Sequence, residues 1–164
     1  MAELRIRQAV RALLVTPDEQ VLLVRFEFPD ATVWSLPGGG LDPGETHLDA
    51  LHRELIEEVG LRDPVVGPHV WNREHLIPHL DGRWDGQRDR YYVVEAPQRF
   101  EPAPALSWEQ LRAERLHELR WWRIDEIERA TTVGDVWFSP RSLGQHLRTL
   151  IADGAPAAPI DTGV

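Results

Sequence analysis

The chain has 164 residues, of which 42% are hydrophobic and 27% are charged, a composition typical of one soluble globular domain. It contains no Cys, which excludes disulfide frameworks, thiolate metal sites and cysteine nucleophiles. The sequence has 27 acidic and 18 basic residues, and every basic residue is Arg. The resulting net charge of −9 argues against a nucleic-acid partner, because binding a phosphate backbone needs a cationic surface. No apolar run approaches the ~18 residues of a membrane span and no signal peptide is evident, so we expect a cytoplasmic protein without a membrane partner.

The first part of the chain predicts strands that end at a glycine-rich loop. Residues 6–15 and 20–26 are rich in aliphatic side chains, and the Thr-Pro-Asp-Glu turn between them predicts a hairpin. A polar loop over 27–33 precedes a short apolar segment, 33–36. That segment stops at residues 37–40, Pro-Gly-Gly-Gly, where glycine gives the backbone unusual freedom.

Residues 46–59 form the clearest predicted helix. Thr46 can cap its start together with Asp49, and Gly60 stands where a helix commonly ends. Its aliphatic residues fall on one stripe, which predicts a buried face; they are Leu48, Leu51, Leu55 and Val59.

The rest of the chain predicts further strands and short helices, separated by long irregular segments. The tail over 152–164 is Pro-rich and unpatterned, so we expect it to be flexible and to leave a single domain over residues 1–151. Strands are predicted over 65–71, 91–95 and 119–123, and helices over 107–116, 125–129 and 139–151.

Three carboxylates gather on one face of the 46–59 helix. Glu54, Glu57 and Glu58 lie three or four residues apart, so they project together while the aliphatic stripe faces the core. Like charges this close raise the pKa of at least one of them, and only Arg53 is within reach to compensate. A divalent cation would relieve the repulsion, and carboxylate oxygens suit Mg²⁺ or Mn²⁺. Taken alone, however, such a charge run is more often a solvated helix face.

The spacing around these carboxylates is more specific. Residues Gly39 to Leu61 fit the Nudix box, G-x5-E-x7-R-E-U-x-E-E-x-G-U with U aliphatic, at every fixed position. The sequence therefore resembles the Nudix hydrolase family, plausibly over roughly residues 4–151. The resemblance implies an α+β fold, a Nudix-like α/β/α sandwich in which helices flank a mixed sheet and the box forms a loop–helix–loop.

The resemblance also implies roles for residues of the box. Arg53 resembles the orienting arginine of the family, paired with Glu45, although an ordinary salt bridge is the alternative. Glu54 would be either a metal ligand or the general base. The implied catalytic residues are Arg53, Glu54, Glu57 and Glu58, and the implied metal ligands are Glu54, Glu57, Glu58 and the carbonyl of Gly38.

Members of this family often need a fourth carboxylate from outside the box. Glu118 is our first expectation, because it stands just before the aromatic strand predicted over 119–123. Glu109 and Glu114 are rivals, and each of the three could equally be a surface charge.

The residues that bind substrate are less constrained. Trp34 could stack on a base, although its strand-like surroundings equally predict a core position. Arg73 and Arg90 flank a long predicted loop and could bind phosphates. In the family a proline at the distance of Pro78 from the box accompanies ADP-ribose activity, which favours ADP-sugar-like substrates and leaves nucleoside triphosphates open.

The resemblance implies Mg²⁺- or Mn²⁺-dependent hydrolysis of a nucleoside diphosphate linked to another moiety X, giving a nucleoside monophosphate and phosphorylated X. The expected partner is a small nucleotide, and a homodimer is left open. The alternatives are a non-catalytic Nudix-fold module that binds or senses nucleotides, and an acidic interaction protein. The intact box favours catalysis over both.

Overall fold

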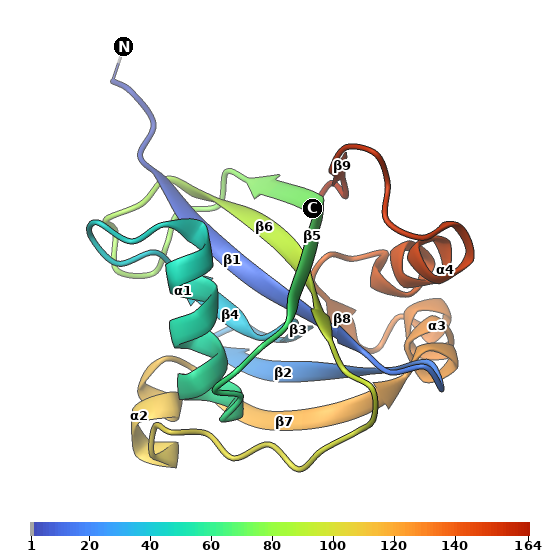
Figure 1. Ribbon diagram of the computed structural model, residues 1–164. Helices are drawn as coiled ribbons and strands as arrows, with labels where there is room; N and C mark the ends of the chain where they lie inside the picture. Colours follow the sequence, from blue (N-terminus) through green and yellow to red (C-terminus); the bar gives the residue numbers. More distant parts are fainter. Residues whose placement is uncertain (1) are drawn as a thin grey trace.

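The computed structural model describes residues 2–164 and is built around one curled, mixed β-sheet (Figure 1). Its strands follow the order β8-β3-β2-β1-β6-β5-β9, while β4 pairs with β1 and β7 pairs with β2. The strands are β1 (Ile6–Val15), β2 (Gln20–Phe28), β3 (Ala31–Ser35), β4 (Gly38–Gly40), β5 (Val66–His75), β6 (Gly86–Glu95), β7 (Leu116–Arg123), β8 (Trp137–Phe138) and β9 (Ile160–Asp161).

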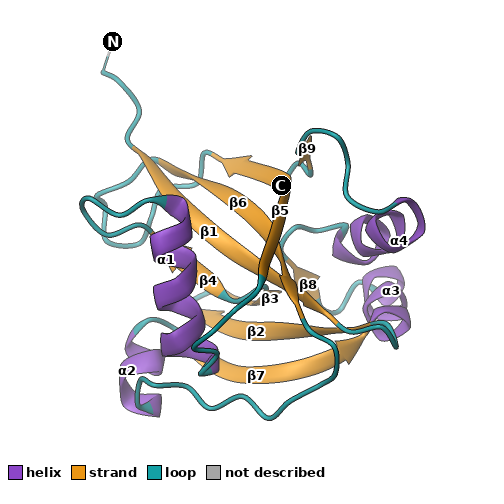
Figure 2. Ribbon diagram, in the orientation of Figure 1, coloured by secondary structure: helices purple, strands orange, loops and turns teal. Residues whose placement is uncertain are grey.

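Helices cover the sheet from two sides (Figure 2). Helix α1 (His47–Glu54), which continues into a π-helical turn over Leu55–Val59, lies on one side, and α3 (Ile124–Val133) and α4 (Leu143–Asp153) lie together on the other. The short α2 (Trp108–Ala113) packs beside β7. The predicted arrangement of a mixed sheet between helices is therefore confirmed.

Within residues 2–164, the helices are too short or too polar to cross a membrane.

The two sides have separate hydrophobic cores, because successive side chains of a strand point to opposite faces. Leu13 of β1 packs in one cluster with Ile127 of α3 and Leu147 of α4. Val10 of the same strand packs in a second cluster with Leu51 of α1. Each fully buried side chain of this size contributes roughly 1.5–3 kcal/mol to stability, so both layers are held by their apolar faces.

Strand β1 positions the glycine-rich loop. It runs parallel to β6 over its whole length and antiparallel to β4, with Ala9 opposite Gly40 and Arg11 opposite Gly38. The start of the box thus lies in the edge strand β4, and the box helix is the next element along the chain, after the loop over residues 41–46. This order brings the carboxylates of the helix back against the three glycines.

The box helix begins and ends where the sequence predicts. The Thr46 hydroxyl accepts from the Asp49 amide and the Asp49 carboxylate accepts from the Thr46 amide, which completes a capping box. Gly60 ends the helix with a φ of 80°, a left-handed conformation that favours glycine. The predicted stripe is wrong at Leu48, which is 47% exposed because it lies in the first turn, outside the core cluster beneath α1.

Several elements are longer than their sequence pattern indicates. Strands β5 and β6 both extend into polar stretches that were expected to be loop, and α3 reaches Val133. In the tail expected to be flexible, Ile160–Asp161 form β9, which pairs in parallel with β5, and the Thr162 amide donates to the Asn72 carbonyl. The mobility of residues 152–164 in solution, and with it the domain boundary, stays a prediction.

Candidate active site

Two carboxylates of the box helix lie against the glycine strand. The Glu58 side chain is 2% exposed, and its Oε2 accepts a hydrogen bond of 2.9 Å from the Gly38 amide. Glu54 is 6% exposed and packs over Gly39, where an added Cβ would lie 2.4 Å from Glu54 Oε1. Glycine at this position is therefore what allows the Glu54 carboxylate to approach the strand.

Arg53 connects the loop to the helix. Its Nε and Nη2 donate to the two carboxylate oxygens of Glu45, each at 2.9 Å, and Nη2 also donates to the Gly40 carbonyl. Its Nη1 donates to Glu54 at 2.9 Å and to Glu57 at 3.2 Å. A planar guanidinium can satisfy these partners at once, which an ammonium cannot, so Arg53 fixes the orientation of the site.

The cluster stores unfavourable electrostatic energy. Burial raises the pKa of Glu54 from 4.5 to about 7, against the lowering effect of Arg53. Burial, followed by the neighbouring Glu54 charge, also raises the pKa of Glu58 well above its usual range. Repulsion between the carboxylates thus contributes to the raised pKa values, and desolvation contributes more than the neighbouring charges do.

The structure favours Glu114 over Glu118 as the outside carboxylate. Glu114 follows α2, and its pKa is raised by burial and then by the charge of Glu57. Its own charge in turn helps to raise the pKa values of both buried box carboxylates. Glu118 instead accepts a hydrogen bond of 3.0 Å from Arg25 Nε.

Glu118 was expected because it precedes the aromatic strand. Glu118 pairs with Arg25 inside β7 and β2, whereas Glu114 lies in the connection before β7. Which of the two completes a metal site stays a prediction. Glu118 lines a separate hollow together with Trp108 and His117. The other rival, Glu109, is exposed in the first turn of α2.

A buried ion pair that the sequence analysis did not single out holds the glycine loop. Arg11 Nε donates to Asp89 Oδ1 at 3.0 Å, and its Nη1 donates to the carbonyls of Leu36 and Gly38. The Gly38 carbonyl, an expected metal ligand, thus already has one partner. A carbonyl oxygen can accept a second, so its role as a ligand stays a prediction. An arginine inside an apolar strand was the available sequence signal.

The predicted substrate residues lie in three different environments. Trp34 takes the core position that its strand-like surroundings also predicted: it is 8% exposed and packs edge-on against Trp122, with ring centroids 5.1 Å apart. Arg73 lies on the same face as Asp89, with its Nη1 3.6 Å from that carboxylate. Arg90 faces α1, where its charge adds to burial in lowering the pKa of His47. Arg73 and Arg90 are therefore on opposite faces of the sheet.

The carboxylates of the cluster are chemically suited to bind a hard divalent cation. Glu54, Glu57 and Glu58 offer only carboxylate oxygens, which Mg²⁺ and Mn²⁺ prefer. The raised pKa values of Glu54 and Glu58 show that their charged forms are disfavoured in the metal-free protein, and a bound cation would stabilise those forms. Within residues 2–164, His, Asp and Glu side chains do not converge as a preformed cage of three. In this arrangement Arg53 and the Gly38 amide hold the carboxylates instead.

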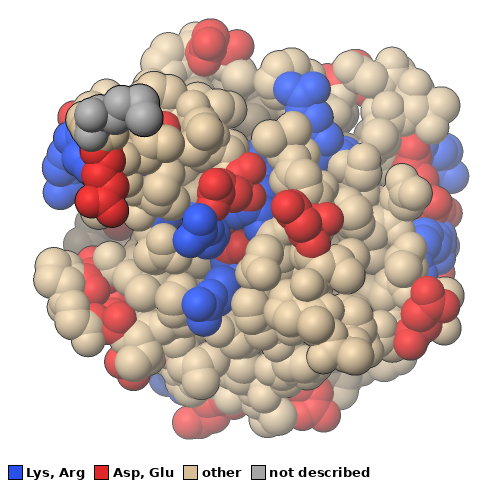
Figure 3. Space-filling model, turned by 90° about the horizontal axis from the view of Figure 1, so that it is seen from above, with Lys and Arg blue, Asp and Glu red and all other residues tan. Residues whose placement is uncertain are grey.

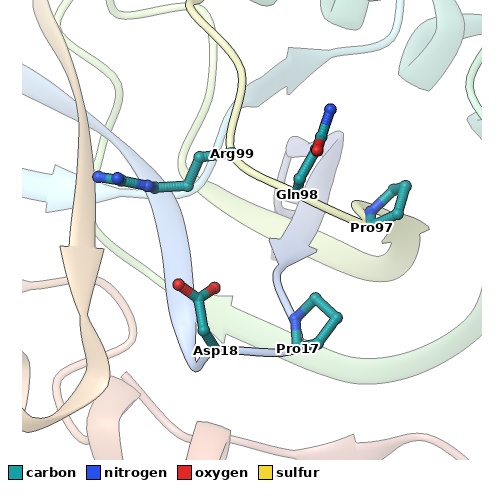
Figure 4. Close-up of a pocket in the computed structure, with 5 residues that line it drawn as sticks. All are labelled: Pro17, Asp18, Pro97, Gln98 and Arg99. Carbon is teal, nitrogen blue, oxygen red and sulfur yellow. The ribbon is translucent and has the colours of Figure 1, made fainter.

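Other surface features lie apart from the cluster. A hollow lined by Pro17, Asp18, Pro97, Gln98 and Arg99 lies at the far end of β1 from the glycine strand, and Asp18 and Arg99 are its charged side chains (Figure 4). On the face seen from above in Figure 3, Arg side chains and acidic side chains are interspersed near the middle. That face therefore has no broad surface of one sign.

Comparison with known proteins adds the family. The chain matches the NUDIX domain family over residues 5–147. The RNA pyrophosphohydrolase of Helicobacter pylori (strain G27) is 33% identical over 104 residues, which cover 57% of this chain and 66% of that protein. The match thus spans just under two thirds of the relative's length.

Solved structures agree with this assignment. A MutT NUDIX hydrolase from Burkholderia pseudomallei is 28% identical with a TM-score of 0.52, covering 74% of this chain and 85% of that one. The NUDIX domain of Shewanella oneidensis NrtR, complexed with ADP ribose, is 17% identical with a TM-score of 0.64, covering 92% and 90% of the two chains, and this likeness concerns the fold alone. Because the family model matches most of this chain and the box is complete, the chain belongs to the NUDIX-domain family.

Proposed function

We propose that this chain is a pyrophosphohydrolase that uses Mg²⁺ or Mn²⁺ to hydrolyse a diphosphate bond in a nucleotide. The observation that carries the proposal is the buried pair Glu54 and Glu58, held against a strand of three glycines beside Arg53. Two carboxylates buried so close together destabilise the metal-free fold, and a bound cation would offset that cost. Such a cluster is typical of a functional site. Membership of the NUDIX-domain family and the name of the Helicobacter relative support the same reaction class.

Each residue of the cluster has a proposed role. Glu57 and Glu58 would hold the metal together with the Gly38 carbonyl, and Glu54 would be either a further ligand or the general base. Glu114 takes the place of the outside carboxylate that was expected for Glu118. When bound, the metal would neutralise phosphate charge and lower the pKa of a coordinated water.

Proton transfer in the proposed mechanism falls to a carboxylate of this cluster. Glu54 is suited to accept the proton of the attacking water, because its pKa of about 7 lets it gain and lose a proton near neutral pH. Glu114 is the alternative base from outside the box. Arg53 keeps Glu54 and Glu57 in place throughout, through its hydrogen bonds to both.

Three observations decide which substrates are worth testing. Pro78 favours ADP-sugar-like substrates, and the family pattern leaves nucleoside triphosphates open. The Helicobacter relative is an RNA pyrophosphohydrolase, so an RNA 5′ end belongs among the substrates to test. The net charge of −9 argues against a long contact with an RNA backbone, yet hydrolysis at a 5′ end needs only its terminal phosphates.

The proposal is tested by following the products from a panel of nucleotides with Mg²⁺, with Mn²⁺ and with EDTA. The panel holds ADP-ribose, a sugar nucleotide, a dinucleoside polyphosphate, nucleoside triphosphates and a 5′-triphosphorylated oligonucleotide. We expect metal-dependent release of a nucleoside monophosphate, or of pyrophosphate from a triphosphate end. Nucleotide binding without turnover on the whole panel would replace the proposal by the alternative of a non-catalytic binding module.

A further inference from the structure

Beside the box, one face of the sheet carries a continuous network of polar side chains. Arg7 of β1 stands opposite Gln87 of β6, and its Nη1 donates to Gln87 Oε1 at 2.8 Å. Gln87 Nε2 in turn donates to Asp89 Oδ1 at 2.9 Å. The same Asp89 carboxylate accepts from Arg11 and lies 3.6 Å from Arg73 Nη1. These five side chains, which we call the arginine face, come from the three neighbouring strands β1, β6 and β5.

The arginine face has more positive charge than its own carboxylate can balance. Asp89, whose side chain is 2% exposed, serves both Arg11 and Arg73. Arg73 Nε is buried and has no hydrogen-bond partner within residues 2–164. Arg7 is half-buried, and its partner Gln87 is neutral; among the described residues no carboxylate lies within ion-pair distance of it. Removing cations from water is costly unless an anion accompanies them, so this face is suited to an anionic ligand.

The arginine face borders the box across the glycine strand. A Cβ placed on Gly40 would lie 2.6 Å from the Arg7 guanidinium, whereas one on Gly39 would meet the Glu54 carboxylate. Since neighbouring residues of a strand face opposite sides, Arg7 and Glu54 flank the same thin edge strand. Burial and Arg11 lower the pKa of Arg7, and the Glu54 charge opposes this shift, so the two side chains interact across β4.

This geometry points to Arg7 as a substrate-binding residue that takes a phosphate beyond the two joined by the scissile bond. We infer that the chain favours substrates with three or more consecutive phosphates over those with two, an inference that rests on the proposed function. The guanidinium is free to present donors in the fork that phosphate oxygens accept, and Gln87 orients it. A free nucleoside triphosphate and the 5′-triphosphate end of RNA share this chemistry.

The test compares substrates that share adenosine and differ in phosphate number. We expect Arg7→Met to lower kcat/KM for ATP at least tenfold and for ADP-ribose less than threefold, because only ATP has a third phosphate to lose its partner. Arg7→Lys should recover part of the loss, since it keeps the charge without the fork. Arg5→Met is the matched control, because Arg5 is exposed two residues earlier and pairs with Asp85. A 5′-triphosphorylated oligonucleotide, compared with ATP, identifies the source of the triphosphate.

A second readout needs no turnover. Calorimetry with inorganic triphosphate in EDTA should show at least fivefold weaker binding to Arg7→Met than to the wild type and to Arg5→Met. Unchanged triphosphate affinity in Arg7→Met, or equal losses of kcat/KM on ATP and ADP-ribose, overturns the inference. If the wild type hydrolyses nothing in the panel, the proposed function fails, and triphosphate affinity alone still decides the role of Arg7.

Discussion

The burial of Glu54 predicts a variant that is more stable than the wild type and inactive. Glu54→Gln keeps the shape of the side chain but removes a charge that the protein holds at 6% exposure. The neutral amide resembles the protonated acid, which the folded state prefers. In metal-free protein the substitution should therefore raise the free energy of unfolding, although it removes the ion pair with Arg53.

The magnitude follows from proton linkage. The pKa of Glu54 is about 7 in the folded protein and 4.5 in its ordinary state, so the folded state holds the proton more tightly. The free energy of unfolding therefore falls as the pH rises from about 4.5 to about 7, and stays reduced above that. Compared with its value at low pH, the free energy of unfolding is lower by about 3 kcal/mol at pH 8 and by less than about 1 kcal/mol at pH 5.

Equilibrium urea denaturation in EDTA at these two pH values measures the effect. Glu54→Gln should gain up to about 3 kcal/mol over the wild type at pH 8 and little at pH 5. Glu118→Gln is the matched control, since its side chain is 45% exposed and pairs with Arg25 outside the cluster, so it should show no such pH-dependent gain. A Glu54→Gln variant that is less stable than the wild type at pH 8, or that gains equally at both pH values, would refute the reasoning.

Four further predictions concern the loop and the metal. Arg53→Lys loses the fork to Glu45, and steady-state kinetics should show at least a tenfold lower kcat, whereas an unchanged kcat contradicts its orienting role. Asp89→Asn leaves Arg11 buried without a countercharge, and urea denaturation should show a loss of about 3 kcal/mol. Gly39→Ala should displace the box carboxylate above it and abolish turnover in a folded protein, as measured by activity and circular dichroism. Millimolar Mg²⁺ should raise the Tm of the wild type in a thermal melt, and an unchanged Tm with substrate also present contradicts a metal site.

Local signals predicted the box accurately. The capping pair Thr46 and Asp49 and the terminal Gly60 act within a few residues, so their chemistry is visible in the sequence. The spacing of the box carboxylates correctly places Glu54 on an α-helix, whereas Glu57 and Glu58 lie in a π-helical turn that the sequence pattern does not indicate. The pairing of Arg53 with Glu45 is present in the structure as expected.

Features that depend on strand register could not be predicted in the same way. Strand β5 ends and β6 begins in polar residues because one face there carries the network around Asp89, so hydrophobic alternation is lost and the sequence indicates a loop. The choice between Glu114 and Glu118 depends on where β7 begins and on its pairing with β2. Each of these involves a partner distant in sequence.

The central claim is that the buried box carboxylates support metal-dependent hydrolysis of a diphosphate bond. The most direct measurement is kcat in Mg²⁺ for the wild type, Glu58→Gln and Glu118→Gln, on the best substrate of the panel. Glu58→Gln removes a charge that is 2% exposed, whereas Glu118→Gln removes one from outside the cluster. We expect Glu58→Gln to lose turnover while staying folded and Glu118→Gln to keep it; normal turnover by Glu58→Gln would contradict metal-dependent hydrolysis by these carboxylates.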